Sequence, residues 1–434
     1  MNVSTRVAAI GAVCALVALP ATAGAVNYPP PKKPAKQQAA PKGPFKTLKV
    51  CKKGKGCFKT IQAAVNKAKP GDTIRIAAGT YREQVKISGK NKRFIKLIGN
   101  PKNPASVKLE GGRKFSNGVW INGADGVTVN GMQAHNYVAN GFFVVNVNGY
   151  TLTNLRAFAV GVYGLYAFNS IGGTMSNSVA AYNNDSGFYV GQTPVQAKPV
   201  RTIIKNVVSY VNVLGYSGTN SRYVTITDSK FYNNGSGIVP NSLDSEKWPP
   251  NENNVFTRNE VFWNNFNYYL GAPFKARPTA VGNIPFPVGV GILVFGGRGN
   301  EVTDNKVFGN YLAGIALVPA ITLKDPTEGV LMNNKVTGNV LGAGGQDLNA
   351  VDITFPGGGS GNCFENNTET APNVPADAAA FPACTPNVPN PDNGTIATIV
   401  AWATAEDHEA HWVKNPHMTI AGITPVEHWT GGLK

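Results

Sequence analysis

The sequence of 434 residues predicts an all-β protein built as a stack of similar coils. Turn-forming residues recur after stretches that alternate apolar and polar residues, with successive gaps of 23, 29, 22, 31, 46 and 29 residues, where 46 is two steps of 23. They are Asn154, Asn177, Asn206, Asp228, Asn259, Asn305 and Asn334. A second ladder consists of glycines, which lie 9 or 10 residues after the corresponding turn residue wherever both are present: Gly141, Gly164, Gly187, Gly215, Gly237, Gly291 and Gly314. A period in the low twenties with short strands is typical of a solenoid.

The residues around each turn predict the shape of one coil. Leu152–Asn154 and Ile226–Asp228 alternate apolar and polar residues, which indicates strands with one buried face. Asn and Gly tolerate the left-handed backbone of a sharp corner, and stacked Asn amides can bond to the coils above and below. A further Asn set repeats this pattern: Asn183, Asn212, Asn234 and Asn265. We therefore expect three short strands and three corners in each coil.

Residues 58–68 predict a helical cap at the start of the stack. Phe58–Val65 has Thr60 in the N-cap position of a short amphipathic helix, with Ile61, Ala64, Val65 and Ala68 on one face. The runs Gly71–Ile76 and Gly79–Glu83 follow as the first strands. A helix in this place would cover the open end of the first coil.

On these runs, residues 57–365 resemble the right-handed parallel β-helix superfamily, which includes pectate lyases and related polysaccharide enzymes. The resemblance implies a single-stranded, right-handed parallel β-helix of about nine or more coils, with an N-terminal capping helix and a C-terminal helical tail. Gly79–Glu83 is also similar to the first signature of pectin methylesterases, but the other signatures of that family are absent. The Gly-His-Gly pattern of polygalacturonases and the Asp-Pro-His-Asp run of alginate epimerases are absent too, so the resemblance implies a fold without naming a reaction.

Composition divides the chain into four segments and predicts secretion. Residues 1–25 have the charge, apolar run and small residues of a signal peptide, and residues 26–56 form a linker rich in Pro and Lys. The β-helix is expected over 57–384 and a tail over 385–434, with a helix from about Thr395 to Trp412. Cysteine spacing suggests disulfides Cys51–Cys57 and Cys363–Cys384, and no later stretch is apolar enough to span a bilayer. We expect a secreted or cell-wall-associated protein whose oligomeric state the sequence leaves open.

The charge balance predicts an anionic partner. The net charge is +16, with 40 Lys and Arg against 24 Asp and Glu, and part of it lies in the linker. A basic surface concentrates polyanions, and outside a bacterial cell these include uronic-acid polysaccharides and wall teichoic acids. The sequence has no nucleic-acid-binding module, so an acidic polysaccharide is the favoured partner and nucleic acid is not expected.

Loop lengths predict the position of a binding face. From a ladder Gly to the next ladder Asn the shortest distance is 13 residues, but it is 19 after Gly187, 22 after Gly237 and 20 after Gly314. All the extra length leaves one sector of the coil, where loops usually build the binding face. Alternation places three aromatic rings outward beside these loops, stacked at about 4.8 Å, where they bind sugar rings or are covered by the C-terminal helix. The candidate substrate-binding residues are Phe143, Tyr166, Tyr189, Gln192 and Trp248.

Candidate catalytic residues lie near the same face. Asp185 occupies a corner where other coils carry apolar residues, and the loop 241–250 contributes Asp244, Glu246 and Lys247. β-Elimination of a uronic acid needs a cation, for which calcium is the candidate, and a base, for which Lys247 or Arg201 is the candidate. Hydrolysis needs two carboxyl groups across the glycosidic bond, which Asp185 with Asp244 or Glu246 would provide.

The sequence leaves two main functions open. One is a secreted β-helix protein that binds and cleaves an acidic polysaccharide, as a lyase or a glycoside hydrolase. The other is a non-catalytic envelope or adhesion protein that binds carbohydrate through the same face. A metal-handling β-helix is a weaker third alternative, because only His135 lies in the coils and the other histidines lie in the tail.

Overall fold

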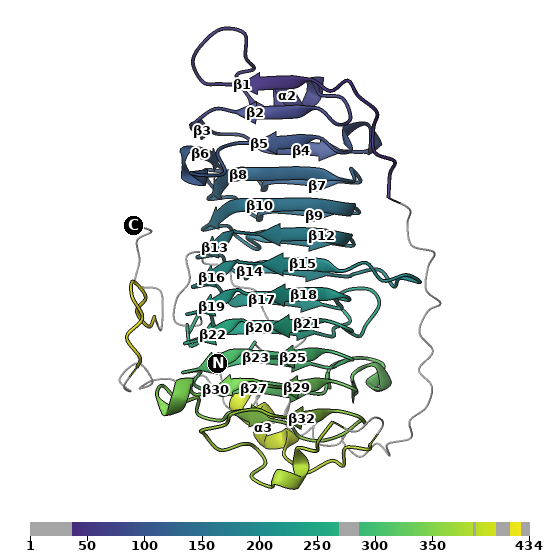
Figure 1. The fold of residues 1–434 in the computed structure, drawn as a ribbon, viewed down its shortest axis with the longest axis vertical. Helices are drawn as coiled ribbons and strands as arrows, with labels where there is room; N and C mark the ends of the chain where they lie inside the picture. Colours follow the sequence, from purple (N-terminus) through teal and green to yellow (C-terminus); the bar gives the residue numbers. More distant parts are fainter. Residues whose placement is uncertain (1–36, 269–285, 385–387, 405–416, 427–434) are drawn as a thin grey trace, which may run out of the picture.

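The protein folds into a right-handed parallel β-helix, as the sequence predicts. The computed structural model describes residues 37–268, 286–384, 388–404 and 417–426. The coils stack along the long axis of the molecule, with helix α2 at one end and helix α3 near the other (Figure 1). The predicted signal peptide and the first residues of the predicted linker lie outside the described residues. Within them, no helix is long and apolar enough to cross a membrane.

One face of the β-helix is a sheet of ten parallel strands, one above another, and we call it the site sheet. Its strands are β4 (Val85–Ser88), β7 (Asn117–Asn122), β9 (Asn140–Val145), β11 (Leu165–Phe168), β14 (Ser186–Gly191), β17 (Leu214–Thr219), β20 (Ser236–Asn241), β23 (Val290–Phe295), β27 (Ala313–Val318) and β31 (Ile353–Thr354). Their inward residues fill the core, as Phe142, Leu165 and Phe188 do.

The other two faces are joined in one sheet of twenty strands, because β8 and β10 are long enough to run through the corner between them. These strands are β1 (Thr47–Val50), β2 (Thr73–Ile76), β3 (Gly79–Tyr81), β5 (Lys96–Ile98), β6 (Val107–Glu110), β8 (Val127–His135), β10 (Asn148–Phe158), β12 (Ile171–Ser176), β13 (Val179–Ala181), β15 (Thr202–Lys205), β16 (Val208–Tyr210), β18 (Val224–Thr227), β19 (Lys230–Tyr232), β21 (Val255–Thr257), β22 (Glu260–Phe262), β25 (Glu301–Thr303), β26 (Lys306–Phe308), β29 (Lys335–Thr337), β30 (Val340–Leu341) and β32 (Cys363–Glu365). A short pair, β24 (Gly297–Arg298) and β28 (Leu331–Met332), lies apart from them.

The N-terminal cap forms as predicted. Helix α2 (Ile61–Lys67) starts after Thr60, whose side chain accepts a hydrogen bond from the Ala63 N–H, and Ile61, Ala64 and Val65 are buried. The carboxylate of Glu83 also accepts hydrogen bonds from the N–H groups of Ile61 and Gln62 at the positive end of the helix. Strand β1 pairs with β2, so the first coil starts inside the range predicted as linker.

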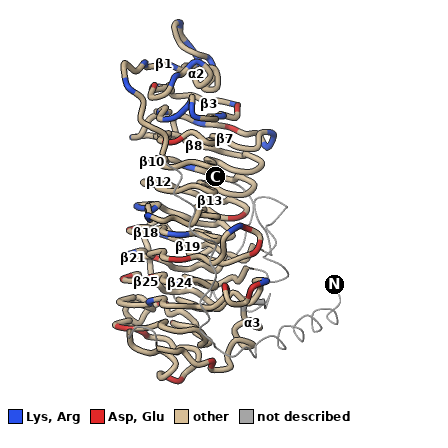
Figure 2. The backbone as a smooth tube through the Cα atoms, turned by 90° about the vertical axis from the view of Figure 1, so that its right-hand side faces the viewer, with Lys and Arg blue, Asp and Glu red and all other residues tan. Residues whose placement is uncertain are grey.

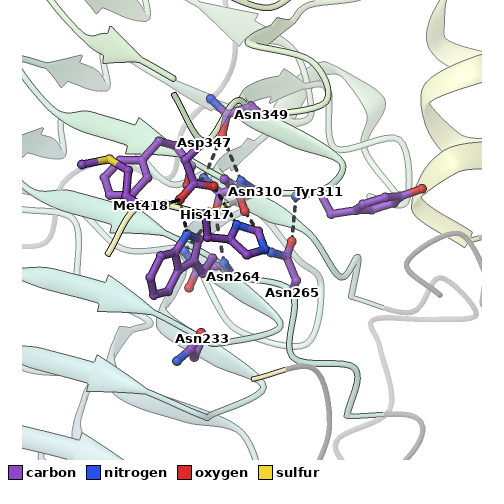
Figure 3. Close-up of polar contacts among 12 residues, drawn as sticks. Asn233, Asn264, Asn265, Asn310, Tyr311, Asp347, Asn349, His417 and Met418 are labelled. Atoms are coloured by element: carbon purple, nitrogen blue, oxygen red, sulfur yellow. Dashed lines mark hydrogen bonds and ion pairs between the residues drawn. The ribbon is translucent and has the colours of Figure 1, made fainter. Parts of the chain in front are cut away.

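Asn side chains stack from coil to coil, and each amide bonds to its neighbours above and below. In Figure 3, Asn264, Asn310 and Asn349 form part of such a stack. The predicted sets mix neighbouring stacks. Thr227 pairs with Thr257, so Asp228 aligns with Arg258, and Asn259 and Asn305 lie one residue later than the ladder members before them. Asn305 bonds to Asn339, whereas Asn334 belongs to a neighbouring stack with Asn300. The stack of Asn183, Asn212 and Asn234 continues through Asn264 rather than Asn265.

The ladder glycines are needed for a different reason from the predicted one. They lie in or beside the strands of the site sheet and have no left-handed backbone. A Cβ atom on Gly164 would lie 2.5 Å from the Gly187 carbonyl oxygen, and one on Gly237 would lie 2.4 Å from the Gly291 carbonyl oxygen. These are steric overlaps, so close contact between coils selects glycine here. Left-handed corners are instead formed by residues such as Asn154 and Asn177.

The C-terminal part packs along the outside of the coils. The disulfides Cys51–Cys57 and Cys363–Cys384 both form as predicted. Helix α3 (Ile396–Thr404) lies in the predicted range, whose remainder lies outside the described residues. Further along, His417 Nδ1 lies 2.9 Å from Asp347 Oδ1 (Figure 3), which attaches the tail to the coils. The short 3-10 helices are η1 (Lys90–Lys92), η2 (Pro104–Ser106), η3 (Pro326–Glu328), η4 (Ala343–Gly345) and η5 (Ala378–Ala380).

Candidate functional site

A row of aromatic side chains runs down the outer surface of the site sheet. Trp120, Phe143, Tyr166 and Tyr189 are direct partners on the successive strands β7, β9, β11 and β14, and Lys86 of β4 stands at the head of the row. Trp120, Phe143 and Tyr166 are half-buried, whereas Tyr189 is only 3% exposed. We call the four rings the aromatic row.

The rings confirm the predicted neighbours but not a uniform stack. Phe143 and Tyr166 are parallel, with ring centroids 4.4 Å apart, as expected for adjacent coils. Tyr166 and Tyr189 are 5.0 Å apart but perpendicular, at 88°. Tyr163, at the preceding corner, lies 4.6 Å from Tyr166 and 4.4 Å from Tyr189, so it packs between them. The row therefore becomes a three-ring cluster at Tyr189.

The orientation of Tyr189 follows from its contact with the long loop 241–250. Its hydroxyl donates a hydrogen bond to Glu246 Oε1, which brings the carboxyl group over the ring cluster. Gly191 leaves the room for this carboxyl group, since a Cβ atom there would lie 2.7 Å from Glu246 Oε2. The other oxygen of Glu246, Oε2, is buried and has no hydrogen-bond partner among the described residues.

Two side chains of the β-helix hold this loop in place. Asn220, with left-handed backbone after β17, donates from its amide nitrogen to the carbonyl oxygens of Leu243 and Glu246, at 2.9 and 2.8 Å. Gln192 accepts a hydrogen bond from the Lys247 N–H at 3.0 Å. Gln192 thus holds the loop in place. Its contact with substrate stays a prediction.

Asp185 lies beside the ring cluster, at the corner before β14. Its backbone N–H donates to the Val162 carbonyl oxygen at 3.1 Å, so the charged residue replaces the apolar residue of the coil below, as predicted. Asp185 Oδ1 accepts a hydrogen bond from the Ser186 hydroxyl at 2.7 Å, and the side chain is buried. Tyr163 follows Val162 and packs on Tyr189, which bonds to Glu246, so it lies between the two carboxyl residues. Burial raises the pKa of Tyr163, and the charges of Asp185, Tyr166 and Glu246 raise it further.

The two carboxyl groups differ in acidity. Burial raises the pKa of Asp185 to about 6, although the hydrogen bond from Ser186 opposes this rise. Burial raises the pKa of Glu246 to about 8, and the charge of Asp185 adds to this rise against the hydrogen bond from Tyr189. Near pH 7, Asp185 is therefore mainly ionised and Glu246 is mainly protonated. Such divergent pKa values mark a possible acid and base pair.

The structure does not bring Asp244 or Arg201 to this pair. Asp244 is exposed and its Oδ2 accepts a hydrogen bond from the Lys324 N–H, 2.8 Å away. Arg201 donates to the Thr225 hydroxyl and to the Asn253 carbonyl oxygen on another face of the coil. Lys247 is exposed beside Glu246, and Trp248 is half-buried in the same loop. Of the two candidate carboxyl pairs, only Asp185 with Glu246 borders the ring cluster, and its catalytic role stays a prediction.

Helix α3 covers a different part of the site sheet. Ile396 and Ile399 pack against Val239, Leu293 and Ala316, which continue the line of the aromatic row on β20, β23 and β27. An apolar cavity of about 90 Å³ remains between this helix and the strands. The hypothesis that the helix covers Phe143, Tyr166 and Tyr189 therefore does not hold for the described residues. Glu246 and its loop cover Tyr189 instead.

The described part of the chain holds no group of three or more His, Cys, Asp or Glu side chains placed to bind a metal ion. A calcium requirement stays a prediction for experiment.

No protein-family model matches the sequence, and no curated protein is significantly similar to it. Distant similarity is found among solved structures. The A-module of the mannuronan C-5 epimerase AlgE4 of Azotobacter vinelandii is 15% identical over 71% of this chain and 90% of that one, with a TM-score of 0.49. A GH87 α-1,3-glucanase catalytic domain is 15% identical over 81% of this chain and 70% of that one, with a TM-score of 0.44. None of these similarities assigns an activity to this chain.

Proposed function

We propose that this protein binds an extracellular acidic polysaccharide along the aromatic row and hydrolyses it beside Tyr189. The observation that carries the proposal is the position of Glu246, whose carboxyl group is held over the end of the row by Tyr189. Tyr189 packs on Tyr163, and Asp185 lies on the coil next to Tyr163. Sugar rings stack on exposed aromatic faces, and three of the four rings of the row are half-buried rather than covered.

The pKa values of the two carboxyl groups suit the base and the acid of glycoside hydrolysis. Glu246, protonated near pH 7, gives its proton to the glycosidic oxygen as the bond to the anomeric carbon breaks. Asp185, ionised at the same pH, takes a proton from the water whose oxygen attacks that carbon. The tyrosines are poor bases here, since burial raises the pKa values of Tyr163, Tyr166 and Tyr189 further above their ordinary value. This favours hydrolysis over elimination by a tyrosine base.

The acidic character of the polymer is supported by Lys86 at the head of the row. A polymer that stacks on Trp120 would bring its next sugar toward this exposed ammonium group. The two disulfides support an extracellular location for the reaction.

The aromatic row gives the first test. Replacing Tyr166 with Ala should weaken binding of the polysaccharide substrate by about tenfold. The change removes the stacking of one sugar ring on one aromatic ring, which contributes about 1 to 1.5 kcal/mol to the binding free energy. Isothermal titration calorimetry with oligosaccharides measures the effect. Tyr232→Ala is the matched control, because Tyr232 also belongs to an outward ring stack but lies on a different sheet. Equal affinities for wild type and Tyr166→Ala would remove the row from the binding site.

The two pKa values predict a bell-shaped dependence of kcat/KM on pH. Activity should rise as Asp185 ionises near pH 6 and fall as Glu246 loses its proton near pH 8. Both pKa values are raised in the folded state, so each group contributes stability at low pH that is lost as the pH rises through its folded value. Initial rates and thermal unfolding measured from pH 5 to about 9 test both effects. A flat rate profile would exclude this pair as the acid and base.

A further inference from the structure

The basic charge of the protein is concentrated at the N-terminal end of the β-helix. Residues 37–120 contain 20 Lys and Arg residues against 3 Asp and Glu residues, whereas the chain as a whole has a net charge of +16. Figure 2 shows these cations around β1, α2 and β3. We call residues 37–120 the cationic end. The charge thus lies mainly on folded coils and their cap, and only partly in the predicted linker.

The three acidic residues of the cationic end have structural partners. Asp72 is buried and accepts hydrogen bonds from the N–H groups of Lys46 and Lys69. Glu83 accepts hydrogen bonds at the start of α2, and Glu110 forms an ion pair with Lys108 at 2.8 Å. These carboxylates therefore offset few of the surface cations.

Most of the cations are exposed. Lys92 is an exception, because its ammonium group donates to the carbonyl oxygens of Val65, Asn66 and Ala68 and so ends helix α2. The exposed residues are Lys42, Lys46, Lys49, Lys52, Lys53, Lys55, Lys59, Lys67, Lys69, Arg75, Arg82, Lys86, Lys90, Lys96, Lys102, Arg113 and Lys114. A surface of this density attracts a polyanion over several charge pairs at once.

We infer that the cationic end is a second binding surface, separate from the Asp185 and Glu246 pair, and that it docks a polyuronate glycan. Lysine dominates it, with 16 of the 20 cations. Lysine acts as a mobile point charge, which suits a flexible polyanion held by many charges rather than one group bound by a bidentate fork. The surface also meets the aromatic row, since Lys86 of β4 and Trp120 of β7 are direct partners. One glycan can therefore run from the cationic end onto rings that suit sugars.

A second copy of this chain is the main competing partner. Residues 286–404, near the other end of the β-helix, contain 10 Asp and Glu residues against 4 Lys and Arg residues. A basic end and an acidic end on one molecule permit head-to-tail contact. The excess at the cationic end is much larger than the acidic excess, so self-association would leave most of the positive charge unpaired.

The test compares two fourfold variants of the mature protein. One replaces Lys49, Lys53, Lys55 and Lys67 of the cationic end with Gln, and these exposed side chains have no hydrogen bond or ion pair in the described part of the structure. The other makes the same change in net charge elsewhere, at the exposed residues Lys198, Lys205, Lys306 and Lys324. Binding of fluorescent polygalacturonate is measured at several salt concentrations, with a neutral glucan and duplex DNA as other probes.

The cationic-end variant should bind polygalacturonate about tenfold more weakly at low salt and show a flatter salt dependence. The control variant should stay within about twofold of wild type. Equal weakening in both variants, or tighter binding to DNA than to polygalacturonate, would overturn the inference. So would a change in sedimentation that shows self-association through this end.

The comparison is repeated in a Glu246→Gln background to separate this inference from the proposed function. If only the proposed hydrolysis is wrong, the two fourfold variants still differ in polygalacturonate binding, although the proteins that keep Glu246 do not cleave the polymer. If only the docking surface is wrong, the proteins that keep Glu246 still cleave the polymer, and the two fourfold variants bind it equally well in both backgrounds.

Discussion

Replacing Glu246 with Gln should lower kcat for polysaccharide cleavage by about 100-fold or more while Kd changes by less than about threefold. Gln keeps the shape of the side chain and can still accept the hydrogen bond from Tyr189, but it cannot give a proton to the leaving oxygen. The proton transfer alone accounts for a loss of this size. Initial rates and calorimetric binding on the same polymer measure the two quantities.

The matched control for this change is Glu260→Gln. Glu260 is a surface residue paired with Lys230 at 2.7 Å, on a different sheet from the site, and its loss should leave both constants unchanged. The variant Asp185→Asn should lower kcat like Glu246→Gln and should abolish the acidic limb of the pH profile. Full activity in Glu246→Gln would show that the carboxyl group only holds the loop in place.

Replacing Gly237 with Ala should lower the free energy of unfolding by about 3 kcal/mol, at the upper end of the usual cost of overpacking. The new Cβ would lie 2.4 Å from the Gly291 carbonyl oxygen and 2.6 Å from a methyl group of Val261. The carbonyl oxygen belongs to the backbone of the next coil, so it can move only if the strands separate. Thermal and denaturant unfolding measure the loss.

Gly43→Ala is the control for this prediction. A Cβ atom on Gly43 would meet only atoms of Phe45, at 3.7 Å or more, and the backbone there is not left-handed. We expect a change of less than about 0.5 kcal/mol. If Gly237→Ala were equally mild, the coils would have to be more deformable than their close contacts indicate.

The fold could be predicted from the sequence because the same physical constraint repeats in every coil. Buried amides such as Asn212 must bond to the coils on both sides, and glycines such as Gly237 must admit a neighbouring backbone, so both recur at the coil period. Single positions were harder to predict. Asn334 and Asn339 are five residues apart, and only the strand register decides which of them aligns with Asn305.

The candidate site could be predicted only in part. Strand register follows from the repeat, so Phe143, Tyr166 and Tyr189 could be placed as neighbours. The roles of Asn220 and Tyr163 depend on how the loop 241–250 folds back, and a loop that occurs once has no repeat to reveal it. For the same reason the sequence offered both Asp244 and Glu246 as partners of Asp185, and only the folded loop distinguishes them.

Product analysis tests the central claim most directly. The protein is incubated with uronic-acid polymers and with neutral glucans, each with and without a calcium chelator. Both new reducing ends and unsaturated products are followed. Hydrolysis by Asp185 and Glu246 predicts new reducing ends without unsaturated products. The Glu246→Gln variant should form no new reducing ends. Unsaturated products would contradict this by showing elimination, and the absence of any product with retained binding would identify a carbohydrate-binding protein without catalysis.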